Sequence, residues 1–300
     1  MQIGIGLPAS GNFASADAII KIARRAEELD YAAVWTFERV LRTTANVPVP
    51  GREGVVAPLP EVYKNVFDSL DTLAFVAAHT HKIKLGTSVV DALFQSPPQL
   101  AKRFATLDQL SNGRVIVGLG QGSQEAEYIA TNTPLKRRGA GFEEYLHALR
   151  AVWGPDPVKF DGRFYKIPEA NINPKPLQNP LPLLIGGSSH AALERAARLA
   201  DGITPSMRAW DVVEHHVKTF HDGARALGRD VSKLHVVARL NTAPNANPQQ
   251  PFGGSLEQIQ EDIARAQAIG LTQVFWDMNW VNLSIDEQLK WMEALRKLFD

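Results

Sequence analysis

The sequence predicts an α/β protein in which eight parallel strands close into a single TIM barrel. Eight apolar runs of strand length occur along the 300 residues, and each is followed by a segment with helical spacing. The runs are largely apolar rather than strictly alternating, as expected for parallel strands covered by helices on one side and packed inside a barrel on the other. Eight β/α units in a chain of this length predict one barrel domain over residues 1–300.

The elements are expected in the order in which the apolar runs occur. The strands are expected at Gln2–Leu7, Ala32–Phe37, Ile83–Val90, Val115–Leu119, Leu183–Gly186, Gly202–Pro205, Leu234–Leu240 and Thr272–Asp277. Helices are expected after each of them. Capping signals mark the start of three helices: Ser255 with Gln258, Ser284 with Glu287, and Ser96 before Pro97.

Three long loops interrupt this alternation. Residues 41–66 follow the second strand and are rich in proline, and residues 241–255 follow the seventh. Loops after barrel strands lie at the C-terminal face, where barrel active sites are built, so both are candidate substrate walls, with plain surface insertions as the alternative. Residues 154–182 contain "VKFDGRFYKI", and its Asp-Gly pair between β-rich arms predicts a hairpin.

The composition excludes several kinds of function. Lys plus Arg equals Asp plus Glu at 32 each, so there is no excess positive charge for nucleic-acid binding. The apolar runs are far shorter than the roughly 20 residues that span a bilayer, and the first residues lack a signal-peptide pattern. We therefore expect a cytoplasmic protein that binds a small molecule and has no membrane contact.

The chain contains no cysteine, which excludes disulfides, thiolate nucleophiles, iron–sulfur clusters and cysteine-ligated zinc. Among its histidines, His215, His216 and His221 are expected on the outer surface of a helix, and only His190 is placed near a site. No metal site is therefore expected. Redox chemistry would need a bound organic cofactor.

Five motifs follow one another along the chain: "IKLGTSVV", "PPQLAKRFATLDQLSNGRVIVGLGQGS", "RRGAGFEEYLHALRAVW", "FDGRFYKI" and "PLLIGGSSHAALERAARLADGI". In this order they resemble the bacterial luciferase-like family, and within it the oxidoreductases that use the deazaflavin coenzyme F420. The resemblance covers nearly the whole chain. It implies a luciferase-like TIM barrel with insertions in its βα loops and a cofactor ring across the C-terminal mouth.

The resemblance also implies which strand ends meet the cofactor ring. The third strand of the family commonly ends in a bulge with a non-prolyl cis peptide, here Ser88-Val89, with an ordinary strand end as the alternative. Glu127 matches the family's acidic residue after the fourth strand, with a salt-bridged helix residue as the alternative. Glycines let the backbone approach a flat ring, so the fourth strand end is expected to border the cofactor through Gly120, Gln121, Gly122 and Ser123.

The run "GRVIVGLGQGS" also invites comparison with a dinucleotide-binding loop. That fingerprint needs a third glycine at position 123, where this chain has Ser123. The acidic residue expected about 20 positions further on, Glu143 or Glu144, falls in a helical segment rather than at a strand end. The run is therefore interpreted as the fourth strand of the barrel.

The motif "IGGSSHAAL" follows the fifth strand and opens a helix. Backbone N–H groups at a helix N-terminus form a ready site for a phosphate group. The resemblance places the cofactor phosphate here and at the next strand end, with close packing of small residues as the alternative. The expected phosphate set is Gly186, Gly187, Ser188, Gly202 and Ile203, with Arg208 as a counter-charge.

The second strand ends in "VWTFERVL", where many deazaflavin enzymes of the family carry Asp-His. Glu38 and Arg39 stand there instead and are the candidate catalytic pair. A permanently protonated arginine is a poor proton shuttle, so Glu38 is the candidate proton relay and Arg39 a candidate ligand for cofactor or substrate oxygens. Gln121 is a second departure, because the family's sugar-phosphate dehydrogenases carry glutamate there. Both departures argue against a sugar-phosphate dehydrogenase.

Aromatic side chains near strand ends suggest an apolar substrate cavity. Phe37, Phe94 and Trp280 are the pocket candidates, whereas Trp35 and Trp276 are expected in the core. The chain is therefore interpreted as an oxidoreductase that transfers hydride between coenzyme F420 and an organic, apolar or conjugated substrate. An FMN-dependent monooxygenase and a cofactor-free or non-catalytic barrel are the alternatives, and a homodimer is the expected assembly.

Overall fold

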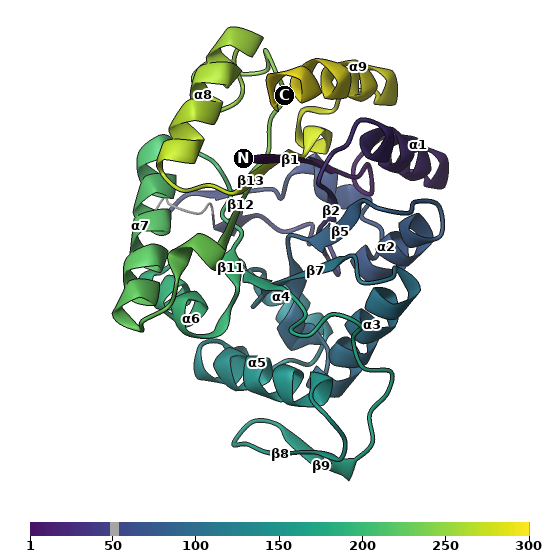
Figure 1. The fold of residues 1–300 in the computed structure, drawn as a ribbon, viewed down its shortest axis with the longest axis vertical. Coiled ribbons are helices and arrows are strands. Elements are labelled where there is room, and N and C mark those ends of the chain that lie inside the picture. Colours follow the sequence, from purple (N-terminus) through teal and green to yellow (C-terminus); the bar gives the residue numbers. More distant parts are fainter. Residues whose placement is uncertain (49–53, 300) are drawn as a thin grey trace.

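The computed structural model describes residues 1–48 and 54–299. Within these residues eight parallel strands form the predicted closed barrel (Figure 1). In barrel order they are β1 (Gln2–Gly6), β2 (Ala33–Thr36), β5 (Lys84–Thr87), β7 (Val115–Gly120), β10 (Leu183–Ile185), β11 (Gly202–Ile203), β12 (His235–Leu240) and β13 (Gln273–Trp276). The last strand pairs in parallel with the first and closes the barrel, with Gln2 opposite Gln273 and Ile5 opposite Trp276.

Each predicted strand is present, and several are a residue or two shorter than expected. The strand predicted at Ile83–Val90 is divided into β5 and the two-residue β6 (Val90–Asp91), and both pair with β7. The division falls at Ser88-Val89, whose peptide bond is cis, as predicted. The pairing with β7 shifts by one residue across this point, from Leu85 opposite Val115 to Val90 opposite Leu119.

Helices surround the barrel on its outside (Figure 1). They are α1 (Ala16–Glu28), α2 (Ser69–Ala77), α3 (Pro97–Leu110), α4 (Glu125–Ala130), α5 (Ala140–Trp153), α6 (His190–Leu199), α7 (Trp210–Ala226), α8 (Leu256–Ala268) and α9 (Ile285–Arg296). Short 3-10 turns occur at η1 (Glu61–Lys64), η2 (Ala92–Phe94), η3 (Leu135–Arg137), η4 (Val231–Lys233), η5 (Met278–Val281) and η6 (Lys297–Phe299). In the part of the chain that the structure describes, no helix has both the length and the apolar character needed to cross a membrane.

Serine caps mark the first residues of two of these helices. The Ser255 and Ser284 hydroxyls each accept a hydrogen bond from the backbone N–H of the third helical residue, and the Gln258 and Glu287 side chains each accept one from the backbone N–H of the cap, so both predicted capping boxes are confirmed. Ser96 precedes α3, with Pro97 at the first helical position as predicted. Its hydroxyl makes no capping bond and donates instead to the Gln99 side chain at 2.8 Å.

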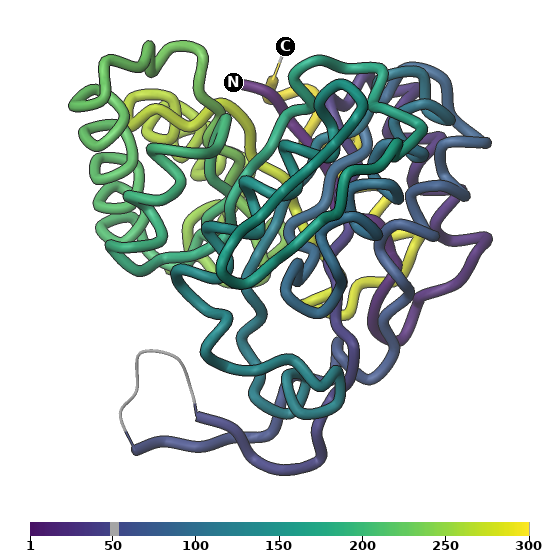
Figure 2. The backbone as a smooth tube through the Cα atoms, turned by 90° about the horizontal axis from the view of Figure 1, so that it is seen from below, coloured from purple at the N-terminus to yellow at the C-terminus, as the bar shows by residue number. Residues whose placement is uncertain are grey.

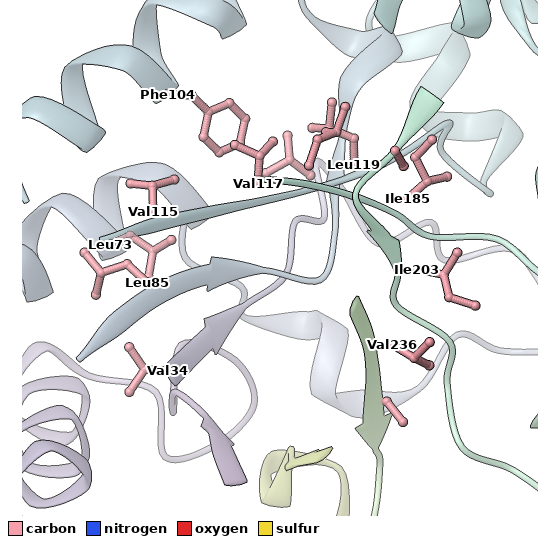
Figure 3. Close-up of a cluster of buried hydrophobic side chains, with 14 of the residues drawn as sticks. Val34, Leu73, Leu85, Phe104, Val115, Val117, Leu119, Ile185, Ile203 and Val236 are labelled. Carbon is pink, nitrogen blue, oxygen red and sulfur yellow. The ribbon is translucent and has the colours of Figure 1, made fainter. Parts of the chain in front are cut away.

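The barrel strands bury apolar side chains in two layers. Outward-facing residues such as Val34, Val117 and Val236 pack against the helices (Figure 3). Inside the barrel a smaller cluster is built around Trp35, which stacks on Phe275 with 5.0 Å between ring centroids. Trp35 and Trp276 are both buried in the core, as predicted. The filled interior leaves the strand ends as the place where a ligand site can form.

Two of the three predicted insertions each contain a pair of short antiparallel strands. The loop after β2 contains the antiparallel strands β3 (Val47–Pro48) and β4 (Val56–Ala57), which lie away from the barrel helices (Figure 2); its residues 49–53 lie outside the described chain. The predicted hairpin is confirmed as β8 (Val158–Asp161) paired with β9 (Lys166–Ala170). The Glu144 carboxylate of α5 accepts three backbone N–H bonds from the hairpin turn, residues 163–165.

Candidate active site

A cavity of about 650 Å³ opens at the C-terminal ends of the barrel strands. Loop and strand-end residues on more than half of the barrel's circumference contribute to it, together with one face of α7. The lining residues are Phe37, Glu38, Arg39, Tyr63, Ser88, Val89, Asp91, Gly120, Gln121, Gly122, Ser123, Gly186, Gly187, Ser188, Thr204, Pro205, Ser206, Arg208, Val212, His216 and Arg239. Most residues expected at the site from the sequence are among them.

The Ser88-Val89 bulge forms one wall of the cavity. The Ser88 hydroxyl shares a hydrogen bond of 2.8 Å with Thr204, and its carbonyl accepts one of 3.1 Å from Arg239. A Cβ atom on Gly120 or Gly186 would lie within 2.8 Å of a Val89 methyl group. Glycine is therefore needed at both flanking strand ends, because a side chain at either position would overlap that of Val89.

The strand end "GLGQGS", expected to border the cofactor, lines the cavity from residue 120 to 123. Gln121 is held at both ends: its side-chain oxygen accepts from the Gly139 N–H at 2.6 Å, and its carbonyl accepts from the Tyr128 hydroxyl. Gly122 has a φ of +84°, and Phe94 packs directly beneath it. Phe94 therefore supports this loop from behind and does not line the cavity, contrary to its predicted place in the substrate pocket.

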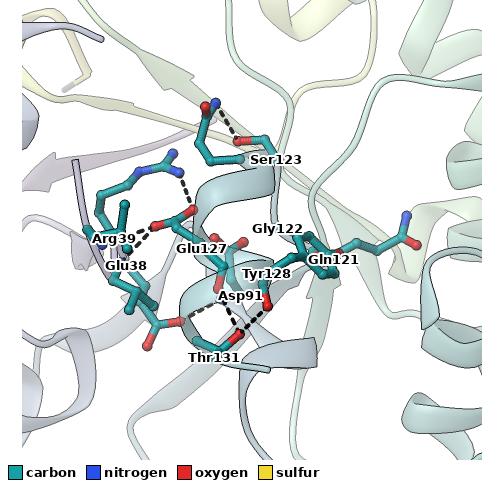
Figure 4. Close-up of polar contacts among 12 residues, drawn as sticks. Glu38, Arg39, Asp91, Gln121, Gly122, Ser123, Glu127, Tyr128 and Thr131 are labelled. Carbon is teal, nitrogen blue, oxygen red and sulfur yellow. Dashed lines mark hydrogen bonds and ion pairs between the residues drawn. The ribbon is translucent and has the colours of Figure 1, made fainter. Parts of the chain in front are cut away.

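Glu127 and Arg39 form a buried ion pair beside the cavity (Figure 4). The Arg39 guanidinium donates to the fully buried Glu127 carboxylate at 2.7 Å and lies over the Tyr63 ring, 4.6 Å from its centroid. The second Glu127 oxygen accepts from the Val40 N–H at 2.8 Å. The Glu127 side chain thus anchors the start of the 41–66 insertion and does not line the cavity.

Glu38 and Asp91 are two carboxyl groups that do line the cavity. The Asp91 N–H donates to Glu38 Oε2 at 2.7 Å, so the end of β6 holds the Glu38 side chain in place (Figure 4). Burial raises the pKa of Glu38 to about 7 and the pKa of Asp91 to about 7. Groups of this kind exchange protons near neutral pH, which is the property of a general acid or base.

The predicted phosphate end of the cavity is formed in part by the expected residues. Gly186, Gly187 and Ser188 line it just before α6, whose first turn is capped by Ser189. Arg208 lines it from the next strand end and is exposed, and the structure records no ion pair for it within residues 1–48 and 54–299.

Gly202 and Ile203 do not reach the cavity. They lie in β11 below it, where a Cβ atom on Gly202 would come within 2.1 Å of the His235 carbonyl of the neighbouring strand. Gly202 therefore allows close strand packing, and the cavity wall on this side is built by the next three residues, Thr204 to Ser206.

An aromatic cluster contributes to the cavity wall. The Arg239 guanidinium lies 4.3 Å from the Phe37 centroid, and Tyr63 packs edge-on against both Phe37 and Trp280. Phe37, Tyr63 and Arg239 line the cavity, whereas Trp280, a predicted pocket residue, lies behind them. An ion pair with Asp277 holds Arg239 at the end of β12.

The sequence prediction missed eight of the lining residues: Tyr63, Asp91, Thr204, Pro205, Ser206, Val212, His216 and Arg239. His216 was expected on the outer surface but is 7% exposed, and burial lowers its pKa. Its spacing from Val213 and Phe220 on the buried face of α7 is the signal that would have found it. His190, expected near the site, is exposed at the start of α6 and lies 3.3 Å from Glu194.

A closed parallel barrel with its ligand cavity at the C-terminal face defines a TIM-barrel enzyme architecture. The chain matches the model of the luciferase-like monooxygenase family over residues 1–272, and it belongs to that family of oxidoreductases and monooxygenases. The monooxygenase RslO1 from Streptomyces bottropensis shares the fold, with a TM-score of 0.82 at 20% identity over 99% of this chain and 98% of that protein.

Two of the curated relatives that this chain resembles are named for different cofactors. An uncharacterized protein of Mycobacterium tuberculosis is 33% identical over 80% of this chain and 79% of its own length. An F420-dependent glucose-6-phosphate dehydrogenase of Amycolatopsis mediterranei is 32% identical over 67% of this chain and 56% of its own length. An FMNH2-dependent dimethylsulfone monooxygenase of Pseudomonas putida is 30% identical over 58% of this chain and 50% of its own length. The chain thus spans about half the length of the last two.

Proposed function

We propose that this protein binds coenzyme F420 across the barrel mouth and transfers hydride between it and a small organic substrate that is apolar or conjugated. The observation that carries the proposal is the cavity itself, which is lined both by glycines just before a helix N-terminus and by a half-buried carboxyl group, Glu38. The first suits a phosphate-bearing cofactor, and the second suits proton exchange with a substrate.

The residues at the mouth fit a cofactor of this kind. Val89 and the glycine-rich strand end of residues 120–123 offer close backbone approach to a flat ring, and the cavity of about 650 Å³ is large enough for a ring system and a second molecule. Gly187, Ser188 and Arg208 would hold the phosphate. When bound, coenzyme F420 supplies the hydride acceptor or donor; the chain supplies position, exclusion of water and proton exchange.

Glu38 and Arg39 have different proposed roles. Glu38 exchanges the proton, because it lines the cavity and burial raises its pKa to about 7. Arg39 stays protonated and forms its ion pair with Glu127. In this position it holds the start of the 41–66 insertion in place and supports the Tyr63 ring, which would face the substrate. Phe37 and Tyr63 supply apolar surface, which supports an apolar or conjugated substrate.

An FMN-dependent monooxygenase is the competing function. The relative from Pseudomonas putida and the family description both favour it, and the same cavity suits the phosphate and ring of FMN. A barrel without a cofactor is the third candidate, since a fold does not define a function. Two relatives of similar identity with different cofactors leave the choice to experiment.

A thermal-shift comparison of coenzyme F420 with FMN tests the proposal. A ligand at a hundred times its dissociation constant stabilises the folded state by about 2.7 kcal/mol, so the true cofactor raises the melting temperature and the other does not. Stabilisation by FMN alone, together with oxygen consumption by the reduced complex, would establish the monooxygenase. No shift with either would support the cofactor-free barrel. The expected homodimer and cytoplasmic location stay predictions, testable by sedimentation velocity and cell fractionation.

A further inference from the structure

We propose that the N-terminal mouth of the barrel is a second ligand site, which binds a small organic acid whose compact apolar body carries a carboxylate at one end and a hydroxyl group at the other. A cavity of about 430 Å³ opens there, at the starts of the barrel strands and so on the opposite end from the candidate active site. Within residues 1–48 and 54–299 the two cavities share no lining residue. The site is therefore independent of the proposed function.

Four polar side chains stand at the starts of barrel strands around this cavity, and all four line it. They belong to the first residues of β1, β5, β12 and β13, which are Gln2, Lys84, His235 and Gln273. β1 and β13 lie side by side in the barrel, with Gln2 opposite Gln273. Strands far apart in the sequence thus bring amide, ammonium and imidazole groups to one opening.

The strand pleat turns these four side chains toward the barrel axis, because residues two apart on a strand face the same side. In β12 and β13 the residues two positions further on are Val237 and Phe275, members of the inner cluster around Trp35. In β1 and β5 they are Gly4 and Gly86, where a Cβ atom would lie within 2.8 Å of the Trp35 indole. Polar groups and open space therefore occupy an inner layer that a filled barrel packs with apolar side chains.

The wall beyond these polar groups is apolar. Ile116, Leu184 and Val237 line the cavity and also pack in the inner cluster of the barrel. Along β12, Val237 lines this cavity, and Arg239, two positions further on, lines the cavity at the other end. The inner cluster therefore lies between the two cavities and closes the inner end of this one. A ligand of this cavity needs an apolar body to cover that surface.

Gln273 is the buried polar group of the site. It is 3% exposed, and its side-chain oxygen has no hydrogen-bond partner in the part of the chain that the structure describes. A buried amide without its bonds is unfavourable, so a ligand group that bonds to it gains affinity. The terminal torsion of glutamine has two nearly equivalent orientations, so either the oxygen or the NH2 group can face the cavity. A hydroxyl group suits both, because it donates and accepts.

The exposed rim carries an excess of positive charge. Lys82 and Asp30 both line the rim, and their charges offset each other in an ion pair of 2.6 Å. Lys84 donates to the Gly113 carbonyl at 3.1 Å, and among the described residues the structure records no carboxylate paired with it. Its ammonium group therefore keeps N–H donors for a ligand, and the His235 ring adds another. A carboxylate at the outer end of the ligand matches this charge.

Calorimetric titration of the full chain with para-hydroxybenzoate, without any cofactor, tests the site. One saturable site per chain is expected. Benzoate lacks the hydroxyl group and should bind about two- to tenfold more weakly, while para-hydroxybenzyl alcohol lacks the charge and should bind at least about tenfold more weakly. Absence of saturable binding at millimolar para-hydroxybenzoate, or equal binding of all three compounds, would overturn the proposal.

Variants then locate the bound acid. Lys84→Met should weaken para-hydroxybenzoate at least about tenfold and leave para-hydroxybenzyl alcohol unchanged, and Gln273→Leu should abolish the difference between para-hydroxybenzoate and benzoate. Lys102→Met, on the exposed face of α3, is the matched control and should change neither. If Gln273→Leu fails to fold, the exposed Lys84 still decides the matter. Binding that Arg208→Ala removes and Lys84→Met leaves intact would place the acid in the C-terminal cavity and overturn the second site.

Discussion

Asp91 is a nearly fully buried carboxyl group, and its environment has a measurable consequence for stability. Burial raises its pKa in the folded protein to about 7 from an ordinary value of 3.8. The folded state therefore holds a proton that the unfolded chain releases. The stability from this group is fully present below about pH 4 and is lost as pH rises through about 7.

Asp91→Asn removes this loss, because the amide stays neutral. We predict that in urea denaturation without ligand the variant is more stable than the wild type at pH 8, by up to about 4 kcal/mol. At pH 4 the difference disappears. Asp161→Asn, which alters an exposed carboxylate, serves as the control and should show no such pH-dependent gain. A variant less stable than the wild type at pH 8 would contradict the raised pKa of Asp91 in the folded protein.

In the Arg39–Glu127 ion pair, by contrast with Asp91, loss of one charge is expected to destabilise the protein, because each buried charge is stabilised by the other. The Glu127 side chain is fully buried and that of Arg39 is 11% exposed. We predict that Glu127→Gln alone destabilises the protein by about 3–5 kcal/mol, since it leaves a buried cation unpaired. Glu127→Gln combined with Arg39→Met should cost less than Glu127→Gln alone in urea denaturation. Glu293→Gln, which breaks the exposed pair with Arg25, is the control and should cost under about 1 kcal/mol.

Helix caps act at the scale of the element, and two serines of this chain make a direct comparison. The Ser284 hydroxyl accepts from the Glu287 N–H at the start of α9, whereas Ser96 makes no capping bond at the start of α3. We predict that Ser284→Ala lowers the free energy of unfolding by about 1 kcal/mol and that Ser96→Ala changes it far less. Equal effects in urea denaturation would show that the capping bond contributes nothing at α9.

The N-terminus of α6 and the strand end after β11 together form the proposed phosphate site. Arg208→Ala removes the arginine side chain of this proposed site. A hydrogen bond to a charged group contributes about 1.5–3 kcal/mol to binding. We predict at least about a tenfold loss of affinity for FMN and no loss for riboflavin, which lacks the phosphate, if calorimetry detects FMN binding. With coenzyme F420 the same comparison uses its phosphate-free deazaflavin core. Arg24→Ala, on the exposed face of α1, is the control; equal losses for both ligands would place the phosphate elsewhere.

Strands and helix starts could be predicted from the sequence where the pattern that indicates them lies within a few neighbouring residues. The eight strands and both capping boxes follow from spacing along the chain, and each is confirmed within a few residues. The glycines at residues 120, 122 and 186 also mark strand ends that line the cavity. Gly202 has the same local signal but serves strand packing, because what a glycine faces depends on the neighbouring strand, here on His235.

The missed site residues depend on contacts between distant parts of the chain. Tyr63 lies in a long insertion and reaches the cavity by packing on Phe37 and Trp280, which are 26 positions before it and 217 after it. Arg239 was counted only as part of an apolar strand, and its ion pair with Asp277 forms when the seventh and eighth barrel strands lie together. Only closure of the whole barrel reveals either residue.

At the scale of the whole molecule, the cavity joins residues from Phe37 to Arg239, on strands spread over most of the barrel. Removal of any strand opens the sheet, since β1 closes against β13. We therefore predict that residues 1–300 unfold in urea as one unit, with coincident transitions by far-ultraviolet circular dichroism and by fluorescence of the tryptophans, which lie between Trp35 and Trp291.

The cofactor should then stabilise the barrel as a single body. At a hundred times its dissociation constant it is expected to move both transitions together by about 2.7 kcal/mol, because it binds only when strand ends far apart in the sequence are assembled. Riboflavin at the same concentration is the control for FMN, since it lacks the phosphate. Movement of the fluorescence transition alone would mean that the cavity side unfolds separately from the rest, which is incompatible with one domain and with a site whose walls are the barrel strands themselves.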